Sequence, residues 1–230
     1  MSAATPAPSP TRVKICGLTS QPDLEAAVVA GADAVGIVAD VPIDTPREVT
    51  TAQASHLVNA TPAFVTTVLV TMPSGPERAI ELAERIEPDV LQLHGEWRQG
   101  DLAYLRAKVS ADLFLAVDAS AIDHARSYDD LAAAFVVDSV DEHGAGGTGE
   151  THDWTQTAAA IEDVESPVIL AGGLTPANVQ EAIETVEPYA VDVSSGIEAE
   201  PGRKDHDAIR SFVATARGGF DRPKSRTTTN

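Results

Sequence analysis

Two short segments rich in glycine and serine follow apolar runs near the end of this 230-residue sequence. Gly172 and Gly173 would let the backbone approach a ligand closely. Ser194, Ser195 and Gly196 offer backbone N–H groups and hydroxyls, and such donors at the start of a helix can hold a phosphate without lysine. One loop of this kind is more typical of a tight turn. Two of them, each after a strand-like run, predict a phosphate site formed by these five residues.

Cys16 and Asp138 are the residues best suited to proton transfer. Each follows an apolar run, at 13–16 and 135–137, and a glycine-rich stretch at 144–149 comes after Asp138. A lone cysteine is more often a small buried apolar residue. A carboxylate in that position is costly to bury unless it binds something or stays protonated, or unless it is a loop or cap residue. On well-separated strands of a barrel, the two could flank a substrate.

Arg47 and His94 are candidate binding residues. Arg47 lies in a proline-containing loop, and its planar guanidinium could bind a carboxylate, although a solvated loop charge is the simpler alternative. His94 could orient a substrate hydroxyl or cap the next helix. No second ligand stands at a fixed spacing from it, so no metal site is expected.

Strand-like and helix-like segments alternate about eight times. Apolar runs typical of strands occur at 13–16, 34–38, 64–70, 90–93, 113–117, 135–137, 168–170 and 190–193. Helices are predicted from about 20 to Gly31 and at 50–59, 76–86, 101–109, 154–162, 176–185 and 205–216, with at most a short helix within 120–131. This alternation predicts parallel strands and a single (β/α)₈ TIM barrel over 11–217, an α/β fold. A doubly wound open sheet has the same periodicity and stays an alternative. The useful polar residues all follow strand ends, where such barrels carry their active sites.

The composition limits the possible partners. The chain carries 35 acidic against 16 basic residues, for a formal net charge of -19. This charge disfavours nucleic acid, and it suggests an acidic surface adapted to high salt, where self-repulsion is screened. An anionic small molecule must therefore be held by local positive features.

Other sequence features favour a soluble cytoplasmic protein. The single cysteine excludes an intrachain disulfide, and no apolar run approaches the length of a membrane helix. Residues 1–10 lack the pattern of a signal peptide and are expected to be flexible, as is a polar tail at 218–230. The sequence leaves open whether the chain is a monomer or a homodimer.

Taken together and in order, these motifs resemble the phosphoribosylanthranilate isomerases over about residues 13–216. The matching pieces are Lys14-Ile15-Cys16-Gly17-Leu18-Thr19, Pro46-Arg47, Gln92-Leu93-His94-Gly95, Asp138 with Gly146-Gly147-Thr148-Gly149, Ala171-Gly172-Gly173-Leu174, Asp192-Val193-Ser194-Ser195-Gly196-Ile197-Glu198, Gly202 and Lys204-Asp205. Two departures are an unusually acidic loop at 39–45 and Thr45 in place of the family's serine near the arginine.

The resemblance implies an Amadori rearrangement of a phosphosugar in tryptophan biosynthesis, with no metal and no organic cofactor. It implies that Cys16 is the general base, Asp138 the general acid and Arg47 the anthranilate-binding residue. We also expect His94 and Asp192 to contact the substrate. Catalysis near neutral pH would then need a raised pKa for the Asp138 carboxyl and a lowered pKa for the Cys16 thiol.

Other phosphosugar barrel enzymes fit the sequence less well. A metal-dependent epimerase would need histidine and aspartate ligands at strand ends, and a Schiff-base aldolase would need a lysine where Asp138 stands. A bifunctional histidine and tryptophan isomerase would have an aspartate in place of Cys16. A phosphate sensor without catalysis would not need both Cys16 and Asp138.

The alternation of side chains along strands makes one structural prediction. Lys14 should face the barrel interior with Cys16, and Asp192 should face it with Ser194. In a closed barrel the last strand neighbours the first, so Lys14 and Asp192 are predicted to form an ion pair just below the active site. The alternative is that Lys14 extends past the strand end without a partner.

Overall fold

The architecture comes from a computed structural model that describes residues 11–138 and 153–218. Eight parallel strands close into a barrel in sequence order. The strands are β1 Arg12–Ile15, β2 Ala34–Val38, β3 Thr66–Thr71, β4 Val90–Leu93, β5 Asp112–Asp118, β6 Ala134–Asp138, β7 Val168–Leu170 and β8 Ala190–Val193. The helices between and after them are α1 Gln21–Ala30, α2 Thr51–Ala60, α3 Pro76–Ile86, α4 Gln99–Arg106, α5 Ile122–Ala125, α6 Trp154–Ile161, α7 Val179–Val186 and α8 His206–Ala216.

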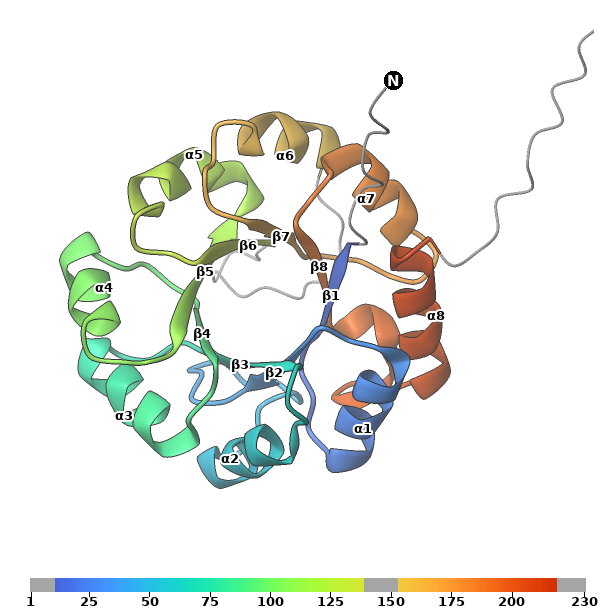
Figure 1. The fold of residues 1–230 in the computed structure, drawn as a ribbon, viewed down its shortest axis with the longest axis horizontal. Helices are drawn as coiled ribbons and strands as arrows, with labels where there is room; N and C mark the ends of the chain where they lie inside the picture. Colours follow the sequence, from blue (N-terminus) through green and yellow to red (C-terminus); the bar gives the residue numbers. More distant parts are fainter. Residues whose placement is uncertain (1–10, 139–152, 219–230) are drawn as a thin grey trace, which may run out of the picture.

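Closure of the barrel decides between the two folds that the sequence allowed. Figure 1 shows the strands as an inner ring and the helices as an outer ring, with β1 beside β8. Four residue pairs align β1 with β8, from Arg12 opposite Ala190 to Ile15 opposite Val193. The single (β/α)₈ barrel is therefore confirmed, and the open doubly wound sheet is excluded.

Capping residues place the helices where the sequence signals them. Ser20 accepts a hydrogen bond from the N–H of Asp23 at the start of α1, and Gly31 ends that helix in the left-handed region. Asp205 accepts from the N–H groups of Asp207 and Ala208 at the start of α8. These side chains satisfy N–H groups that have no partner within the first helical turn. Side-chain caps therefore fix the start of α1 and of α8.

Alternate residues of each strand face opposite sides of the barrel wall. Val13 and Ile15 pack outward with the helices in the main core cluster. Lys14 is buried in the other direction, and Cys16 packs with Val68 in a separate interior cluster. Because the interior is filled by side chains, polar residues at strand ends come together at the rim.

Some predicted boundaries were wrong, for local reasons. The third strand begins at Thr66 rather than at residue 64, because Phe64 has a positive φ of 72° and a fully exposed side chain. The segment 120–131 holds only the short helix α5 flanked by 3₁₀ turns, as expected from its irregular pattern. The segments expected to be flexible lie outside the described residues, apart from Gly218, and the glycine-rich stretch at 144–149 also lies outside them.

A small hairpin between β8 and α8 was not predicted. Strand β9 (Glu198–Glu200) pairs antiparallel with β10 (Arg203–Lys204). Its short strands carry charged residues, which do not give the apolar alternation that signals a strand. The hairpin lies beside the rim of the barrel, where its Glu198 contacts Arg47.

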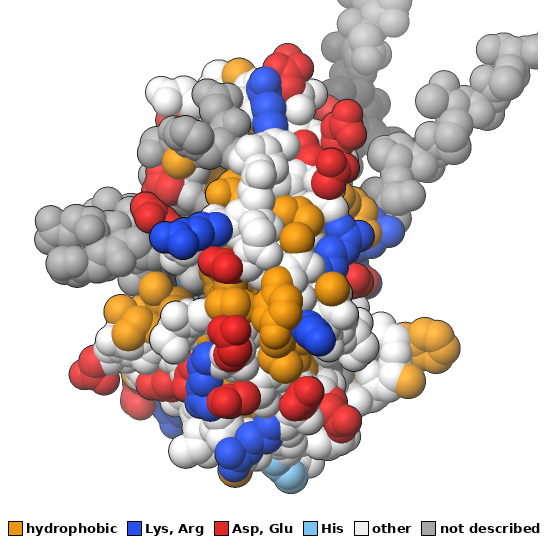
Figure 2. Space-filling view, turned by 90° about the vertical axis from the view of Figure 1, so that its left-hand side faces the viewer, with side chains coloured by type: hydrophobic (Ala, Val, Ile, Leu, Met, Phe, Trp, Pro, Cys, Tyr) orange, Lys and Arg blue, Asp and Glu red, His pale blue; other side chains and the backbone are white. Residues whose placement is uncertain are grey.

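The surface carries mixed charges. Figure 2 shows acidic and basic side chains interspersed with exposed hydrophobic ones on one side of the molecule. Among the described helices, none is long and apolar enough to cross a membrane.

Candidate active site

One pocket at the carboxyl ends of the strands collects all ten site residues predicted from the sequence. It contains about 820 Å³ of space not filled by protein, including its open mouth. The predicted residues that line it are Cys16, Arg47, His94, Asp138, Gly172, Gly173, Asp192, Ser194, Ser195 and Gly196. Apolar side chains from the β2 and β3 ends, including Val41, Ile43 and Met72, line another part of the same wall. The pocket can therefore take a ligand with an apolar part and several polar groups.

Cys16 follows β1 directly and is fixed by the barrel seam. Its N–H donates to the carbonyl of Val193 over 2.8 Å, and the residue is only 7% exposed. Burial raises the pKa of the Cys16 thiol, and Asp192 adds to this, whereas Lys14 and Lys204 favour the thiolate. The sequence-based expectation of a lowered pKa is therefore wrong for the ligand-free protein, because desolvation outweighs the two nearby cations.

Lys14 and Asp192 form the predicted ion pair beneath the pocket. The Lys14 Nζ lies 2.6 Å from the Asp192 Oδ2, and both side chains are buried. Burial disfavours the ammonium form, but Asp192 and Cys16 outweigh burial and raise the Lys14 pKa. Lys14 is therefore a permanent cation close to the thiol. The Asp192 Oδ1 has no hydrogen-bond partner within the described part of the chain.

Asp138 is the last residue of β6 and reaches the pocket from the far side of the barrel. It is 9% exposed, and its backbone pairs in register with Asp118 of β5. The pocket thus has a thiol at the end of β1 and a carboxyl at the end of β6, as the strand order predicts. Thiols and carboxyls are groups that can serve as a general base or a general acid.

Two loops, 171–176 after β7 and 194–197 after β8, lie against each other; we call them the glycine–serine loops because the first supplies Gly172 and Gly173 and the second Ser194 and Ser195. Gly172 and Gly173 both have positive φ, at 86° and 61°. A Cβ on Gly196 would lie 1.9 Å from the carbonyl oxygen of Leu174, so only glycine permits this approach of the two loops. The Asn178 side chain braces the first loop, since its Nδ2 donates to the Gly173 carbonyl over 3.0 Å. Their polar groups therefore face the pocket from a fixed frame.

Arg47 is not a solvated loop charge. Its Nε and Nη2 donate to the two carboxylate oxygens of Glu198 at 2.8 and 2.9 Å, and its side chain is 20% exposed. One edge of the guanidinium is thus already occupied by a carboxylate of the protein. Arg47 still lines the pocket, and Nη1 has no hydrogen-bond partner among the residues that the structure describes.

His94 lines the pocket as a neutral side chain. Burial, with a smaller contribution from Lys14, lowers the His94 pKa to about 4. Its Nε2 lies 3.2 Å from the Gln92 Nε2, so His94 can accept a hydrogen bond from that amide. It does not cap the following helix, because the N-cap of α4 is Arg98.

Three pocket-side residues were not assigned a role from the sequence. Gln92 lines the pocket, and its Oε1 lacks a hydrogen-bond partner among the described residues. Glu198 and Lys204 lie just behind the wall, where Lys204 donates to Glu198 and to the Ser194 carbonyl. All three stood within the quoted motifs, but no spacing rule links Glu198 to Arg47, 151 residues away.

A closed eight-stranded barrel with a thiol, a carboxyl, an arginine and two glycine-containing loops in one pocket at the strand ends defines the class of (β/α)₈-barrel enzymes. A family model described as N-(5'-phosphoribosyl)anthranilate (PRA) isomerase matches residues 13–215. The chain belongs to the phosphoribosylanthranilate isomerase family.

Individual relatives support the same assignment. The chain is 56% identical over 209 residues to the N-(5'-phosphoribosyl)anthranilate isomerase of Halobacterium salinarum, covering 90% of this chain and 95% of that protein. It is 53% identical over 205 residues to the enzyme of that name from Halorubrum lacusprofundi, covering 89% and 96% of the two chains.

Solved structures match the fold along nearly the whole barrel. The isomerase from Thermotoga maritima superimposes with a TM-score of 0.80 at 35% identity, covering 90% of this chain and 99% of that one. A phosphoribosyl anthranilate isomerase in complex with reduced 1-(o-carboxyphenylamino)-1-deoxyribulose 5-phosphate has a TM-score of 0.78 at 33% identity, with the same coverage of 90% and 99%.

Proposed function

We propose that this enzyme isomerises N-(5-phosphoribosyl)anthranilate to 1-(o-carboxyphenylamino)-1-deoxyribulose 5-phosphate, an Amadori rearrangement in L-tryptophan biosynthesis. The observation that carries the proposal is a single pocket, in a chain of this family, that unites Cys16, Asp138, Arg47 and both glycine–serine loops. A relative of the same fold binds a reduced form of that product.

Each end of the substrate has a matching part of the pocket. The phosphate would lie on Gly172, Gly173 and the Ser194–Gly196 turn, which offer backbone N–H groups and hydroxyls. The anthranilate carboxylate would bind the free edge of Arg47. The aromatic ring would then contact the apolar wall near Ile43 and Met72.

Hydroxyl groups of the sugar would lie between these ends. The neutral His94 is positioned as a hydrogen-bonding partner for them, and so is the Asp192 Oδ1, which has no partner among the described residues. Because Asp192 already neutralises Lys14, a neutral hydroxyl suits it better than a second anion.

Proton transfer would use the two opposite walls. Asp138 would protonate the ring oxygen, and cleavage of the C1–O bond would open the ring to a cationic iminium. The Cys16 thiolate would then remove the proton from C2, and the electron pair of that bond would neutralise the iminium to give an enolamine. Loss of the enol proton and protonation of C1 would give the ketone, so the atoms balance without a redox step.

The raised thiol pKa sets a requirement on this sequence of events. In the ligand-free protein the thiol form of Cys16 is favoured at neutral pH. A cationic iminium beside the sulfur would add to the fields of Lys14 and Lys204 and favour the thiolate. Ring opening would therefore favour the ionised form of Cys16 that removes the C2 proton in the next step.

Turnover tests the proposal directly. Freshly made phosphoribosylanthranilate is incubated with the protein, without added metal, and the loss of anthranilate-type fluorescence is followed. We expect a rate proportional to protein concentration and at least about 100-fold lower for a Cys16→Ala preparation. A wild-type rate no faster than the buffer blank would exclude the function.

The proposed function and the relatives also bear on the cellular location, the surface charge and the oligomeric state of the enzyme. The biosynthetic role supports a cytoplasmic location, and the charge of -19 supports an acidic, salt-adapted surface. Both relatives named above come from halophilic archaea. The phosphosugar is the proposed small-molecule partner. For the oligomeric state, the two alternatives are a monomer and a homodimer; one solved relative is described as monomers generated from the dimeric isomerase of Thermotoga maritima.

A further inference from the structure

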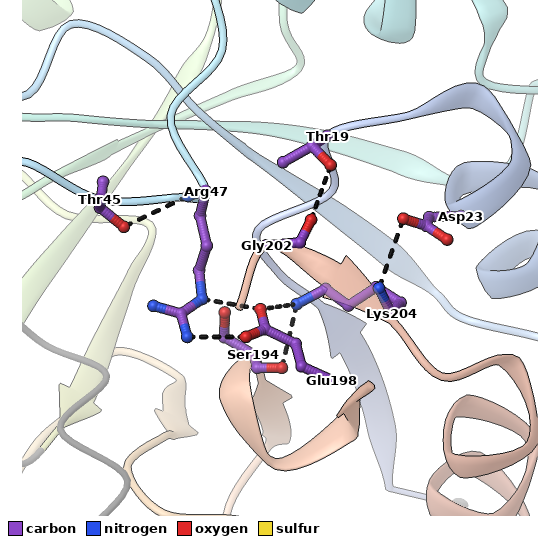
Figure 3. A network of polar contacts seen from close by, with 8 residues as sticks. All are labelled: Thr19, Asp23, Thr45, Arg47, Ser194, Glu198, Gly202 and Lys204. Atoms are coloured by element: carbon purple, nitrogen blue, oxygen red, sulfur yellow. Dashed lines mark hydrogen bonds and ion pairs between the residues drawn. The ribbon is translucent and has the colours of Figure 1, made fainter. Parts of the chain in front are cut away.

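The hairpin β9–β10 places a buried charge network behind the pocket wall. Figure 3 shows Glu198 between Arg47 and Lys204, with Lys204 also reaching the Ser194 backbone. The Lys204 Nζ lies 2.9 Å from a Glu198 carboxylate oxygen and 3.0 Å from the Ser194 carbonyl oxygen. The Lys204 side chain is fully buried and that of Glu198 is 6% exposed. Water therefore screens these contacts only weakly.

Glu198 neutralises two cations that would otherwise repel each other. Burial alone would raise the Glu198 pKa, but Arg47 and Lys204 outweigh burial and lower it, so the carboxylate stays ionised. Its two carboxylate oxygens accept the hydrogen bonds that Nε and Nη2 of Arg47 donate along one edge of the guanidinium. A guanidinium has five N–H donors in a rigid plane. The plane is thus fixed by one edge, and the remaining edge can meet a second carboxylate.

Packing holds the hairpin against the loop that carries Arg47. Gly202, in the turn between β9 and β10, has φ of 79°, and a Cβ there would lie 2.3 Å from the Pro46 carbonyl oxygen. The Gly202 carbonyl accepts a hydrogen bond of 2.8 Å from the Thr19 hydroxyl. The hairpin therefore cannot shift without moving the residue next to Arg47.

We propose that Glu198 is a positioning residue: it holds one edge of Arg47 so that the other edge faces the substrate carboxylate, while Lys204 ties this pair to the Ser194 loop that faces the phosphate. The distance between the two anion-binding ends of the pocket is then set by one contiguous network. This inference rests on the proposed function, because it assumes a ligand that carries both a carboxylate and a phosphate.

Glu198→Gln tests it, because the change keeps the shape and removes the charge. Two ligands are compared by calorimetry: reduced 1-(o-carboxyphenylamino)-1-deoxyribulose 5-phosphate and the same compound without its carboxyl group. We expect binding of the carboxylated ligand to weaken about 10- to 100-fold, the range for a lost charged hydrogen bond, and binding of the decarboxylated ligand to change less than about 2-fold. In turnover, KM should rise with little change in kcat.

Matched variants separate positioning from general damage. Glu200→Gln removes a charge from the same strand, at a residue that pairs with the exposed Arg203, and should change neither ligand. Arg47→Ala should weaken the carboxylated ligand selectively, and adding Glu198→Gln to it should cost nothing further. Equal losses for both ligands, or additive losses in the double variant, would overturn the proposal.

A structure of the wild-type complex gives a test that does not depend on a variant folding. The Arg47–Glu198 pair should persist, with Nη1 on the ligand carboxylate. An Arg47 that leaves Glu198 to reach the ligand would show that Glu198 competes with the substrate instead of positioning its partner. If wild-type protein binds neither ligand, the proposed function fails, whereas selective failure of the variants concerns Glu198 alone.

Discussion

Lys14 of β1 and Asp192 of β8 form a buried ion pair across the seam where the barrel closes, with 2.6 Å between Nζ and Oδ2. Lys14 stands two residues before Cys16 and faces the same side of the strand, so the same lysine pairs across the seam and favours the thiolate form of Cys16. A stability change and a reactivity change should therefore accompany the loss of this one cation.

Removing Lys14 should strongly destabilise the fold. Lys14→Met leaves Asp192 buried without a counter-charge, which costs about 3–5 kcal/mol in comparable sites. The free energy of unfolding is measured by denaturant titration at one fixed salt concentration. Arg12→Met, on the same strand but stacked on the exposed Tyr189, should cost less than about 1 kcal/mol. The double variant Lys14→Met/Asp192→Leu should recover much of the loss. A loss in Lys14→Met no larger than that in Arg12→Met would contradict a stabilising pair.

Loss of either proposed proton-transfer group should reduce turnover without disturbing the fold. Cys16→Ala and Asp138→Asn should each lower kcat by about 10²- to 10⁴-fold, the usual range for a general acid or base. The circular dichroism spectrum and ligand affinity should change little, because both side chains lie at the pocket wall. Near-wild-type turnover in either variant would remove that residue from the mechanism.

The ionisation of Cys16 can be followed without interference, because it is the only cysteine in the chain. Burial raises its pKa, so less thiolate is present near neutral pH than in a free cysteine. Alkylation by iodoacetamide should therefore be slow at pH 7 and should still accelerate above the ordinary thiol range of about 8.5. The urea-unfolded chain is the matched control and should show the ordinary midpoint. A midpoint below that of the unfolded chain would contradict the balance of burial and charge described above.

His94 should make the protein less stable in mild acid. Its folded pKa of about 4 lies below the usual value of 6.5, so the unfolded chain takes up the proton first as the pH falls. Between these two values the unfolded state binds more protons than the folded state. The free energy of unfolding therefore decreases as the pH is lowered from about 6.5 to about 4 and levels off below that. The effect is on the order of 2 kcal/mol once partial exposure is allowed for.

His94→Gln isolates this contribution, because the carboxylates titrate in both proteins. The difference in unfolding free energy between wild type and variant should shift in favour of the variant as the pH falls from about 7 to about 4. A difference that is constant with pH would mean that His94 titrates alike in the folded and unfolded states.

The sequence predicted much of the site because the barrel topology converts chain order into position. Residues such as Cys16 and Asp138 follow strand runs, and all parallel strands end at the same rim. The Lys14–Asp192 pair was predictable for the same reason: alternation gives the direction of each side chain, and closure gives the neighbouring strand. The predicted start of β3 was wrong because phenylalanine is common in strands, whereas Phe64 has a left-handed backbone conformation.

Other features depend on tertiary structure alone. The ion pair between Arg47 and Glu198 joins a loop after β2 to a hairpin after β8. No local sequence pattern specifies such a contact. The direction of the Cys16 pKa shift depends on whether burial, which raises the pKa, outweighs Lys14 and Lys204, which lower it. The degree of burial is a property of the packed pocket rather than of residue type. Sequence order thus determined which groups meet at the rim. Three-dimensional packing determined which of them pair and how strongly each is desolvated, because both depend on distances that chain spacing does not set.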